Sequence, residues 1–295
     1  MARVLLTGSS GFIGKAVALR LIQAGHDVLG VDPIRDESTT IDYVADDLSS
    51  IDRLRRILTD FRPTHVIHTG GVSGPMVISD QPARIMAINV TGSLNLLQAC
   101  LDCGAGVFVH CSSISAIGEY YEPEPIDEHY PMRPVNPYGY SKAAVDMVLR
   151  GLWGKIPMEV CSLRFTSVYG PGRQTSHSIH AIIEAARSGQ PVTVQGATDS
   201  PYVYIDDAAD AAVAACFSEN RRQLAYFIAH PEMVSVEDIV SAVEGVTGPI
   251  AWEIDPTLPH VRRGPLDVVS AARDFDFTAK VNHQEGIRRI LASAG

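Results

Sequence analysis

The chain of 295 residues lacks the features that mark membrane proteins, secreted proteins and proteins that bind nucleic acids. No apolar run approaches the roughly 18 residues that a membrane-spanning helix needs, and no segment resembles a signal peptide. Positive charge is scarce, with 24 Lys and Arg against 34 Asp and Glu, which argues against a broad nucleic-acid interface. We therefore expect neither a membrane nor a nucleic acid as a partner.

Cysteine is also scarce, and the number of cysteines is odd. Five cysteines scattered over a long chain favour reduced thiols and a cytoplasmic location. Cys100 and Cys103 form a C-x-x-C at the end of a helical pattern, but no second pair completes a zinc site. His177 and His180 have helical i, i+3 spacing and no carboxylate partner. We therefore predict two thiols at a helix end, and no metal site.

What the sequence does contain is a regular alternation of short apolar runs with helical patterns. The runs "RVLLTG", "DVLGVD", "THVIHTG" and "GVFVHCSS" are too short for helices, and amphipathic segments separate them. This alternation predicts an α/β fold with a Rossmann-type doubly wound parallel sheet. The spacing is less regular after about residue 170. We expect a first domain over residues 1–170 and a smaller C-terminal α/β lobe over residues 171–295, with some segments returning to the core.

The segment "TGSSGFIG" puts Gly8, Gly11 and Gly14 at the turn from the first strand into the first helix. One glycine allows the tight turn, one lets backbone N–H groups approach a pyrophosphate, and one allows close helix–strand packing. Asp32, at the end of the second strand, can accept hydrogen bonds from the ribose hydroxyls of NAD and would repel the 2′-phosphate of NADP. These residues predict NAD as the cofactor, while the nearby Arg35 leaves NADP open.

The segment "ADDLSS" follows the third strand and offers a second contact for the same cofactor. Asp47 is placed to receive the adenine amino group. The alternative is that Asp47 or Ser49 caps the helix that follows.

Several segments between residue 3 and about residue 215 resemble the extended short-chain dehydrogenase/reductase family, which includes the nucleotide-sugar epimerases and dehydratases. "TGSSGFIG" is similar to the family's TGxxGFIG, "CSSISAIG" to its serine strand end, "NPYGYSK" to YxxxK, "LRFTSVYGPG" to LRxxNVYGPG and "YVYIDDAADA" to YVDD. The resemblance implies that NAD contacts Gly8, Ser10, Gly11, Phe12, Ile13, Asp32, Asp47, Leu48, His68, Gly70, Asn89, Tyr138 and Lys142.

The resemblance also decides between the two tyrosines of "NPYGYSK". Tyr138 and Lys142 are four residues apart and share a helix face, whereas Tyr140 lies roughly 160° away from Lys142 on the helical wheel. A phenol acts as a base at neutral pH only beside a cation, which Lys142 supplies. Ser113, at the carboxyl end of a strand, completes the implied catalytic group. Tyr138 would remove a hydroxyl proton while hydride passes to the nicotinamide, and Lys142 would also anchor the ribose.

The substrate end departs from the nucleotide-sugar enzymes. Ser167 stands where those relatives have an asparagine, and Ser200 and Pro201 stand near the place of an arginine that clamps a diphosphate. Arg262 and Arg263, like Arg173, are positioned to compensate. "HTGGVSGP" and "SSISAIGEYY" resemble segments of uronate dehydrogenases. The predicted substrate-binding residues are Ser73, Ser113, Ser115, Ser167 and Arg173, the last of them for a carboxylate.

The sequence therefore predicts an NAD-dependent oxidoreductase that acts on a secondary alcohol or carbonyl of a sugar, sugar acid or similar polyol. The alternative is a nucleotide-sugar 4-epimerase or dehydratase that retains its NAD. A non-catalytic NAD-binding regulator is disfavoured, because Ser113, Tyr138 and Lys142 are all present. Relatives pair two long helices, here "ARIMAINVTGSLNLLQA" and "SKAAVDMVLRGLW", and so a homodimer is expected. We expect surplus apolar residues on these helices, namely Ile85, Met86, Met147 and Trp153.

Overall fold

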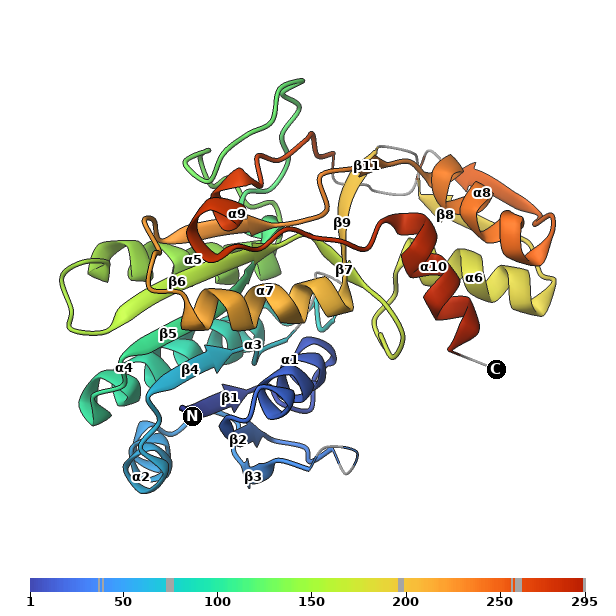
Figure 1. Ribbon diagram of the computed structural model, residues 1–295. Helices are drawn as coiled ribbons and strands as arrows, with labels where there is room; N and C mark the ends of the chain where they lie inside the picture. Colours follow the sequence, from blue (N-terminus) through green and yellow to red (C-terminus); the bar gives the residue numbers. More distant parts are fainter. Residues whose placement is uncertain are drawn as a thin grey trace.

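The computed structural model describes residues 1–36, 38, 40–72, 77–195, 199–255, 257 and 262–293. Its main element is a sheet of seven strands in the order β10-β6-β5-β4-β1-β2-β3, in which every neighbouring pair is parallel. These strands are β1 (Arg3–Thr7), β2 (Asp27–Asp32), β3 (Asp42–Ala45), β4 (His65–His68), β5 (Val107–Ser113), β6 (Glu159–Phe165) and β10 (Ala225–Ile228). The prediction of a doubly wound, Rossmann-type parallel sheet is confirmed (Figure 1).

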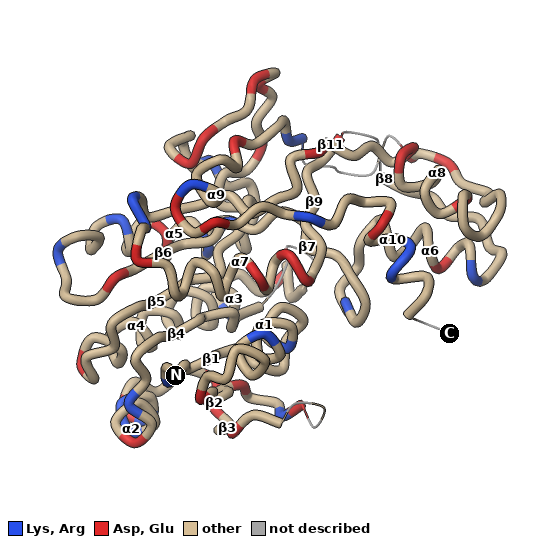
Figure 2. Tube along the Cα trace, in the orientation of Figure 1, with Lys and Arg blue, Asp and Glu red and all other residues tan. Residues whose placement is uncertain are grey.

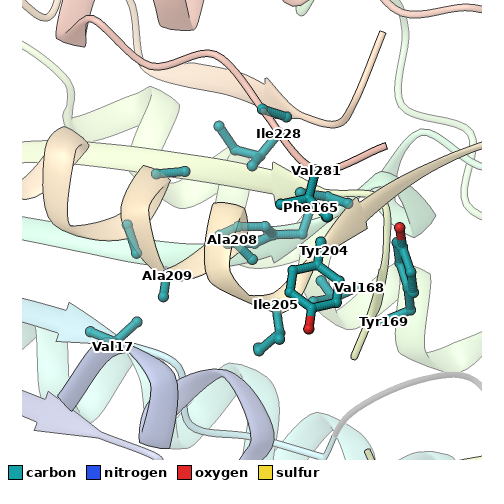
Figure 3. Packing of buried hydrophobic residues seen from close by; sticks show 14 of the residues in the cluster. Val17, Phe165, Val168, Tyr169, Tyr204, Ile205, Ala208, Ala209, Ile228 and Val281 are labelled. Atoms are coloured by element: carbon teal, nitrogen blue, oxygen red, sulfur yellow. The ribbon is translucent and has the colours of Figure 1, made fainter. Parts of the chain in front are cut away.

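Helices cover both faces of this sheet. On one face α1 (Phe12–Gln23) packs against α7 (Ile205–Phe217), and on the other α2 (Ile51–Phe61) packs against α4 (Ser93–Cys103), beside α5 (Pro137–Leu152). Two apolar cores result, one on each face, because each strand buries residues on both of its sides. Figure 3 shows the first core, where Val17 of α1 faces Ala208 and Ala209 of α7.

The helix before β5 has a local irregularity that bears on the site. α3 (Pro82–Met86) continues directly into a π-helical segment, η1 (Ala87–Gly92), and then into α4. The predicted long helix over "ARIMAINVTGSLNLLQACL" is therefore present, but a wider turn interrupts it. Such π-turns often occur at functional sites. This one contains Asn89, which is buried.

The last strand of the main sheet comes from the second half of the chain. β10 pairs with β6, so a segment after residue 171 completes the sheet that begins at Arg3. α7 likewise returns to cover the sheet beside α1. In Figure 1 both elements, coloured orange, lie against the blue and green N-terminal part of the fold.

Most of the remaining elements form a smaller lobe beyond the carboxyl ends of the strands (Figure 1). A three-stranded sheet, β11-β9-β7, leads into it, and a two-stranded sheet, β12-β8, belongs to it. Its elements are α6 (Ser178–Ser188), β8 (Val192–Gln195), β9 (Ser200–Tyr204), β11 (Met233–Val234), α8 (Val236–Thr247), β12 (Trp252–Asp255) and α10 (His283–Ala292). Two short elements, η2 (Ile114–Ala116) and β7 (Ser167–Tyr169), flank the site, and α9 (Val269–Phe275) packs against β10 and α7 of the main sheet.

Charge and hydropathy give no sign of an unusual environment. Figure 2 shows Lys and Arg spread over the elements rather than gathered in one basic patch. Among the described residues, no helix is both long and apolar enough to cross a membrane. All five cysteines are free, and Cys103 is the last residue of α4.

Candidate active site

The glycine-rich turn between β1 and α1 lies where the strand order reverses, between β1 and β4. Gly8 has φ +69°, and a Cβ on it would lie 2.6 Å from the backbone nitrogen of Gly70. A Cβ on Gly14 would lie 2.0 Å from the carbonyl oxygen of Gly8. Only glycine therefore fits at these positions, and the two backbones meet at the switch point where open α/β sheets bind ligands.

The start of α1 is suited to an anionic ligand. Gly11 is the N-cap and has no side chain to accept from the first N–H groups, while Phe12 and Ile13 open the helix and are partly exposed. Free N–H groups at a helix start attract phosphate. Asp32 lies beside this turn, because its carboxylate accepts from the backbone of Ser10 at 3.3 Å. The site therefore fits a dinucleotide with its pyrophosphate at α1 and a ribose at Asp32.

The surroundings of Asp32 bear on the choice between NAD and NADP. The guanidinium of Arg35 lies over the Tyr43 ring, 5.7 Å from its centroid. Tyr43 in turn donates to the carbonyl oxygen of Asp32 at 2.5 Å. The carboxylate of Asp32 also accepts from the backbone of Ile34 at 3.0 Å, which fixes its orientation.

The segment after β3 differs in part from the prediction. Asp47 is exposed, and its carboxylate accepts from the backbone and hydroxyl of Ser49. Neither residue caps α2, because the N-cap is Ser50, which accepts from the backbone of Arg53. The alternative that Asp47 or Ser49 caps the helix was therefore wrong, and the cofactor contact of Asp47 stays a prediction. Leu48 is buried at a left-handed backbone position, φ 64°, directly after Asp47.

A buried chain of hydrogen bonds joins the glycine turn to the π-turn. His68 contacts the Thr7 hydroxyl at 2.6 Å through Nδ1 and the Ser93 hydroxyl at 2.7 Å through Nε2. Ser93 donates to the carbonyl oxygen of Asn89. Burial, with a smaller contribution from Lys142, lowers the pKa of His68 to about 3, so its imidazole is neutral. His68 therefore holds β1, β4 and the helix together.

Asn89 extends this chain to α5. Its side chain accepts from the backbone nitrogen of Val72 at 2.8 Å and donates to the Ser141 hydroxyl at 3.0 Å. Ser141 donates to the carbonyl oxygen of Tyr138. Asn89 was predicted as a cofactor contact. In the structure its side-chain amide instead links the segment after β4 to the helix that carries Tyr138.

The three predicted catalytic side chains lie at one end of the main sheet. The ammonium of Lys142 lies 6.0 Å from the centroid of the Tyr138 ring and donates to the carbonyl oxygen of Cys111 on β5 at 2.8 Å. Ser113 ends the same strand, and its hydroxyl accepts from the backbone of Ser115 at 3.1 Å. Lys142 is almost completely buried, whereas Tyr138 is partly exposed. A buried cation thus lies near the ring of a tyrosine that solvent or a ligand can reach.

The sequence around Tyr138 explains why α5 starts here. Asn136 caps the helix by accepting from the backbone of Gly139 at 2.8 Å. A Cβ on Gly139 would lie 2.4 Å from the carbonyl oxygen of Ser115, so this glycine lets α5 approach the end of β5. Tyr140 points elsewhere and is 54% exposed. The periodicity of α5 therefore places Tyr138 beside Lys142 and turns Tyr140 toward solvent.

The predicted substrate residues are only partly brought together. Ser115 is buried in η2 directly after Ser113, and Ser167 starts β7 and is partly exposed. Arg173 donates to the carbonyl oxygens of Val168 and Thr175, so part of its guanidinium holds the chain after β7. Ser73 lies outside the described residues.

Arg173 and Arg263 bring positive charge to Tyr138. Burial lowers the pKa of each guanidinium, and the nearby Tyr138 counteracts this effect in both. Nε of Arg263 is buried without a hydrogen-bond partner among the described residues. Arg262, by contrast, is exposed and lies over the ring of Tyr121 at 5.9 Å. Of the two neighbouring arginines, Arg263 is therefore the one that faces the site.

Two further residues, for which the sequence predicted no role in the site, lie near it. Tyr120 is 1% exposed, and its hydroxyl has no partner among the described residues. His177 lies 5.6 Å from the ring of Tyr202, and its Nδ1 is buried and unpartnered. Burial, followed by Arg173, lowers the pKa of His177 well below its usual value, so it is neutral. Tyr120 lies in "SSISAIGEYY", the segment that resembles uronate dehydrogenases, so that resemblance was a signal that could have marked it. No local pattern marks His177, which contacts a distant segment at Tyr202.

The fold and this site together define a dinucleotide-dependent enzyme of the Rossmann type. The chain belongs to the NAD dependent epimerase/dehydratase family, whose family model matches residues 4–228. It is thus a member of the extended short-chain dehydrogenases/reductases, as its motifs indicated, and its cofactor is NAD.

Three UDP-glucose 4-epimerases match this chain over nearly their whole length. The chain is 30% identical to the UDP-glucose 4-epimerase of Azospirillum brasilense, over 99% of this chain and 91% of that protein. The UDP-glucose 4-epimerase of Thermus thermophilus, solved in complex with NAD, superposes with a TM-score of 0.87 at 31% identity, covering 98% of both chains. The enzyme of Thermotoga maritima, solved with UDP-glucose, has a TM-score of 0.89 at 25% identity, covering 98% and 97%.

Proposed function

We propose that the protein is an NAD-dependent 4-epimerase of a nucleotide sugar. The observation that carries this proposal is the arrangement of Tyr138, Lys142 and Ser113 beside Arg263, a guanidinium with an unpartnered Nε. The relatives support the same choice, because UDP-sugar epimerases match along almost the entire chain. The alternative from the sequence analysis thus becomes the leading function, ahead of a free-sugar dehydrogenase.

The roles follow from the contacts. Tyr138 accepts the proton of the substrate hydroxyl, since its phenol is reachable and Lys142 lies over its ring. Lys142 is held by the carbonyl oxygen of Cys111, so its charge stays close to the phenol. Ser113 hydrogen-bonds the substrate oxygen that loses the proton. Bound NAD supplies the oxidising capacity, taking two electrons from the substrate carbon and returning them.

The anionic part of a nucleotide sugar needs a cation, and the site offers one. A diphosphate binds best to a guanidinium that no protein carboxylate neutralises. No salt bridge of Arg263 is found among the described residues, although Glu119 lies within electrostatic range of its guanidinium, and burial strengthens any charge-assisted contact that it makes. Arg263 therefore takes the place of the arginine that relatives carry where this chain has Ser200 and Pro201.

An assay of reaction products tests the proposal. The protein is incubated with NAD and, separately, with UDP-glucose, UDP-glucuronate, free glucuronate and free galacturonate. We expect a C4-epimerised product from a UDP sugar without net NADH absorbance, and no product from the Tyr138→Phe variant. Net NADH from a free sugar acid, with no epimerised UDP sugar, would contradict the proposal.

A specific observation keeps the dehydrogenase as a second candidate. β9 begins with Ser200 and Pro201, and Pro201 pairs with Met233 of β11, so this position supplies no arginine. A smaller substrate with one carboxylate needs one guanidinium instead of a clamp. The assay above separates the two candidates, because only the dehydrogenase leaves NADH behind.

We also propose that the protein is a cytoplasmic homodimer that pairs α3–α4 and α5. Met86, Met147 and Trp153 are 38%, 63% and 46% exposed, and Tyr140 adds a further large side chain to α5. Ile85 does not belong to this face, because it is buried in the protomer, and its inclusion in the predicted set was wrong. Exposed apolar residues clustered on neighbouring helices are typical of interfaces.

Light scattering tests the dimer. We expect twice the protomer mass at micromolar concentration, and a shift toward the monomer for Met147→Glu. Val246→Glu is the matched control, because Val246 is similarly exposed, at 55%, on α8 in the other lobe. A monomeric mass for the unmodified protein would refute the pairing.

A further inference from the structure

Tyr120 combines deep burial with an unused hydrogen-bonding group. Its hydroxyl has no partner among the described residues, although the side chain is only 1% exposed. A buried hydroxyl without a partner destabilises a protein, so most are paired. An unpaired hydroxyl in a ligand-binding region is explained if the ligand completes the hydrogen bond.

Two distant segments fix the position of Tyr120. Its backbone nitrogen donates to the carbonyl oxygen of Arg262 at 3.3 Å, and Ile126 exchanges backbone hydrogen bonds with Pro265 and Asp267. The segment after β5 and the segment before α9 therefore run side by side, as the green and red traces do in Figure 1. This pairing sets Tyr120 beside Arg263, one residue beyond Arg262.

The ring of Tyr120 is anchored independently of its hydroxyl. It belongs to a small apolar cluster with Ile114, Ile117 and Phe227, and lies next to Tyr130 at 6.0 Å between ring centroids. Apolar packing therefore holds the ring in place, and its hydroxyl has no structural task among the described residues.

The charges around Tyr120 indicate what it binds. Tyr120 and Tyr138 both lie within electrostatic range of the Arg263 guanidinium. Burial is the main reason that the pKa of Tyr120 is raised far above its usual value, so the phenol stays protonated and donates. Glu119 also lies within electrostatic range of Arg263, but no salt bridge between them is found among the described residues. A donor hydroxyl beside such a guanidinium suits an anionic oxygen.

We propose that Tyr120 is a further substrate-binding residue, whose hydroxyl donates to the anionic oxygen group that Arg263 holds. This inference rests on the proposed function and adds to it a residue that distinguishes substrates with an anion at this position from neutral ones. The anionic oxygen belongs either to a diphosphate or to a sugar carboxylate, which share this chemistry.

Calorimetric titration of the NAD-loaded protein tests the inference with two probes. UDP carries a diphosphate without a sugar acid, and glucuronate carries a carboxylate without a phosphate. Tyr120→Phe removes only the hydroxyl. The matched control is Tyr226→Phe, because Tyr226 is also completely buried but its hydroxyl is paired with Asp274 at 2.7 Å.

We expect Tyr120→Phe to raise the Kd of the probe that binds by about tenfold to a hundredfold, the effect of losing a hydrogen bond to a charged group. Tyr226→Phe should leave that Kd unchanged. Without ligand, Tyr120→Phe should keep or raise the Tm, by roughly 2 °C, whereas Tyr226→Phe should lower it. UDP as the affected probe identifies a diphosphate, and glucuronate a carboxylate.

Two results would refute the role of Tyr120, and a third would also refute the proposed function. If the unmodified protein binds a probe and Tyr120→Phe binds it equally well, the role of Tyr120 is refuted and the proposed function stands. A Tm lowered by Tyr120→Phe as much as by Tyr226→Phe would mean a structural hydroxyl and would also refute it. If the unmodified protein binds neither probe, both the inference and the proposed function fail.

Discussion

The ion pair between Arg164 of β6 and Asp146 of α5 gives a sharp prediction for stability. Both side chains are 0% exposed, and Nε of Arg164 lies 2.8 Å from Oδ2 of Asp146. Ser162 donates to the other carboxylate oxygen at 2.6 Å, and Arg164 also donates to the carbonyl oxygen of Glu128. Asp146→Ala leaves the guanidinium buried without its counter-ion. Removing one partner of a buried pair costs about 3–5 kcal/mol of unfolding free energy.

Urea denaturation measures this loss, and the chain offers a matched control. Asp102 pairs with Arg55 at 2.8 Å, but the two side chains are 34% and 46% exposed. Asp102→Ala should therefore cost less than about 1 kcal/mol. The double variant Asp146→Leu/Arg164→Met should recover most of the loss, since it removes both charges.

This result matters for the site because Asp146 lies one helical turn after Lys142 on α5. A loss below about 1 kcal/mol for Asp146→Ala, or a double variant as unstable as the single one, would refute the reasoning. The first outcome would mean that water or rearrangement compensates the charge. The second would mean that packing, and not the uncompensated guanidinium, dominates.

Three further predictions concern the cofactor, the catalytic group and pH. Tyr138→Phe should nearly abolish turnover and leave NAD affinity within a few-fold, whereas Tyr140→Phe should lower turnover only slightly. The reverse result would contradict the placement of Tyr138, and not Tyr140, on the same helix face as Lys142. Asp32→Ala should narrow the preference for NAD over NADP in titrations, and equal affinities in the unmodified protein would refute the role of Asp32. Because the folded-state pKa of His68, about 3, is below the unfolded value near 6.5, its contribution to stability is complete above pH 6.5 and is lost as the pH falls toward 3. Between pH 7 and pH 5 the unfolding free energy should fall by about 2 kcal/mol less in His68→Gln than in the unmodified protein, and equal slopes would refute this.

The parts of the site that the sequence predicts are those set by local geometry. The glycine turn is encoded within eight residues, and Asp32 ends the neighbouring strand. The separation of Tyr138 from Tyr140 follows from helix periodicity alone. The parallel sheet follows from the alternation of short apolar runs with amphipathic segments. In each case the prediction needed only the periodicity of one element or the connection between two neighbouring elements.

The parts that escaped prediction depend on contacts between distant segments. Tyr120 meets Arg263 because two loops pair across more than a hundred residues, and no periodicity encodes such a pairing. Ile85 is buried because α3 packs against α5 of the same protomer, a contact between segments more than 50 residues apart. Ser50 replaces Asp47 and Ser49 as the helix cap, a difference of the size that helix boundaries commonly show.

The return of α7 and β10 to the main sheet constrains how the chain acquires its structure on the ribosome. The N-terminal part of a protein emerges first and begins to fold first. Here the strands from β1 to β6 leave the ribosome with the edge of β6 unpaired and with the face that α7 covers still bare. An open edge beside an apolar face promotes association between nascent chains. We therefore expect the interval until residue 228 emerges to be the period when this protein depends most on chaperones.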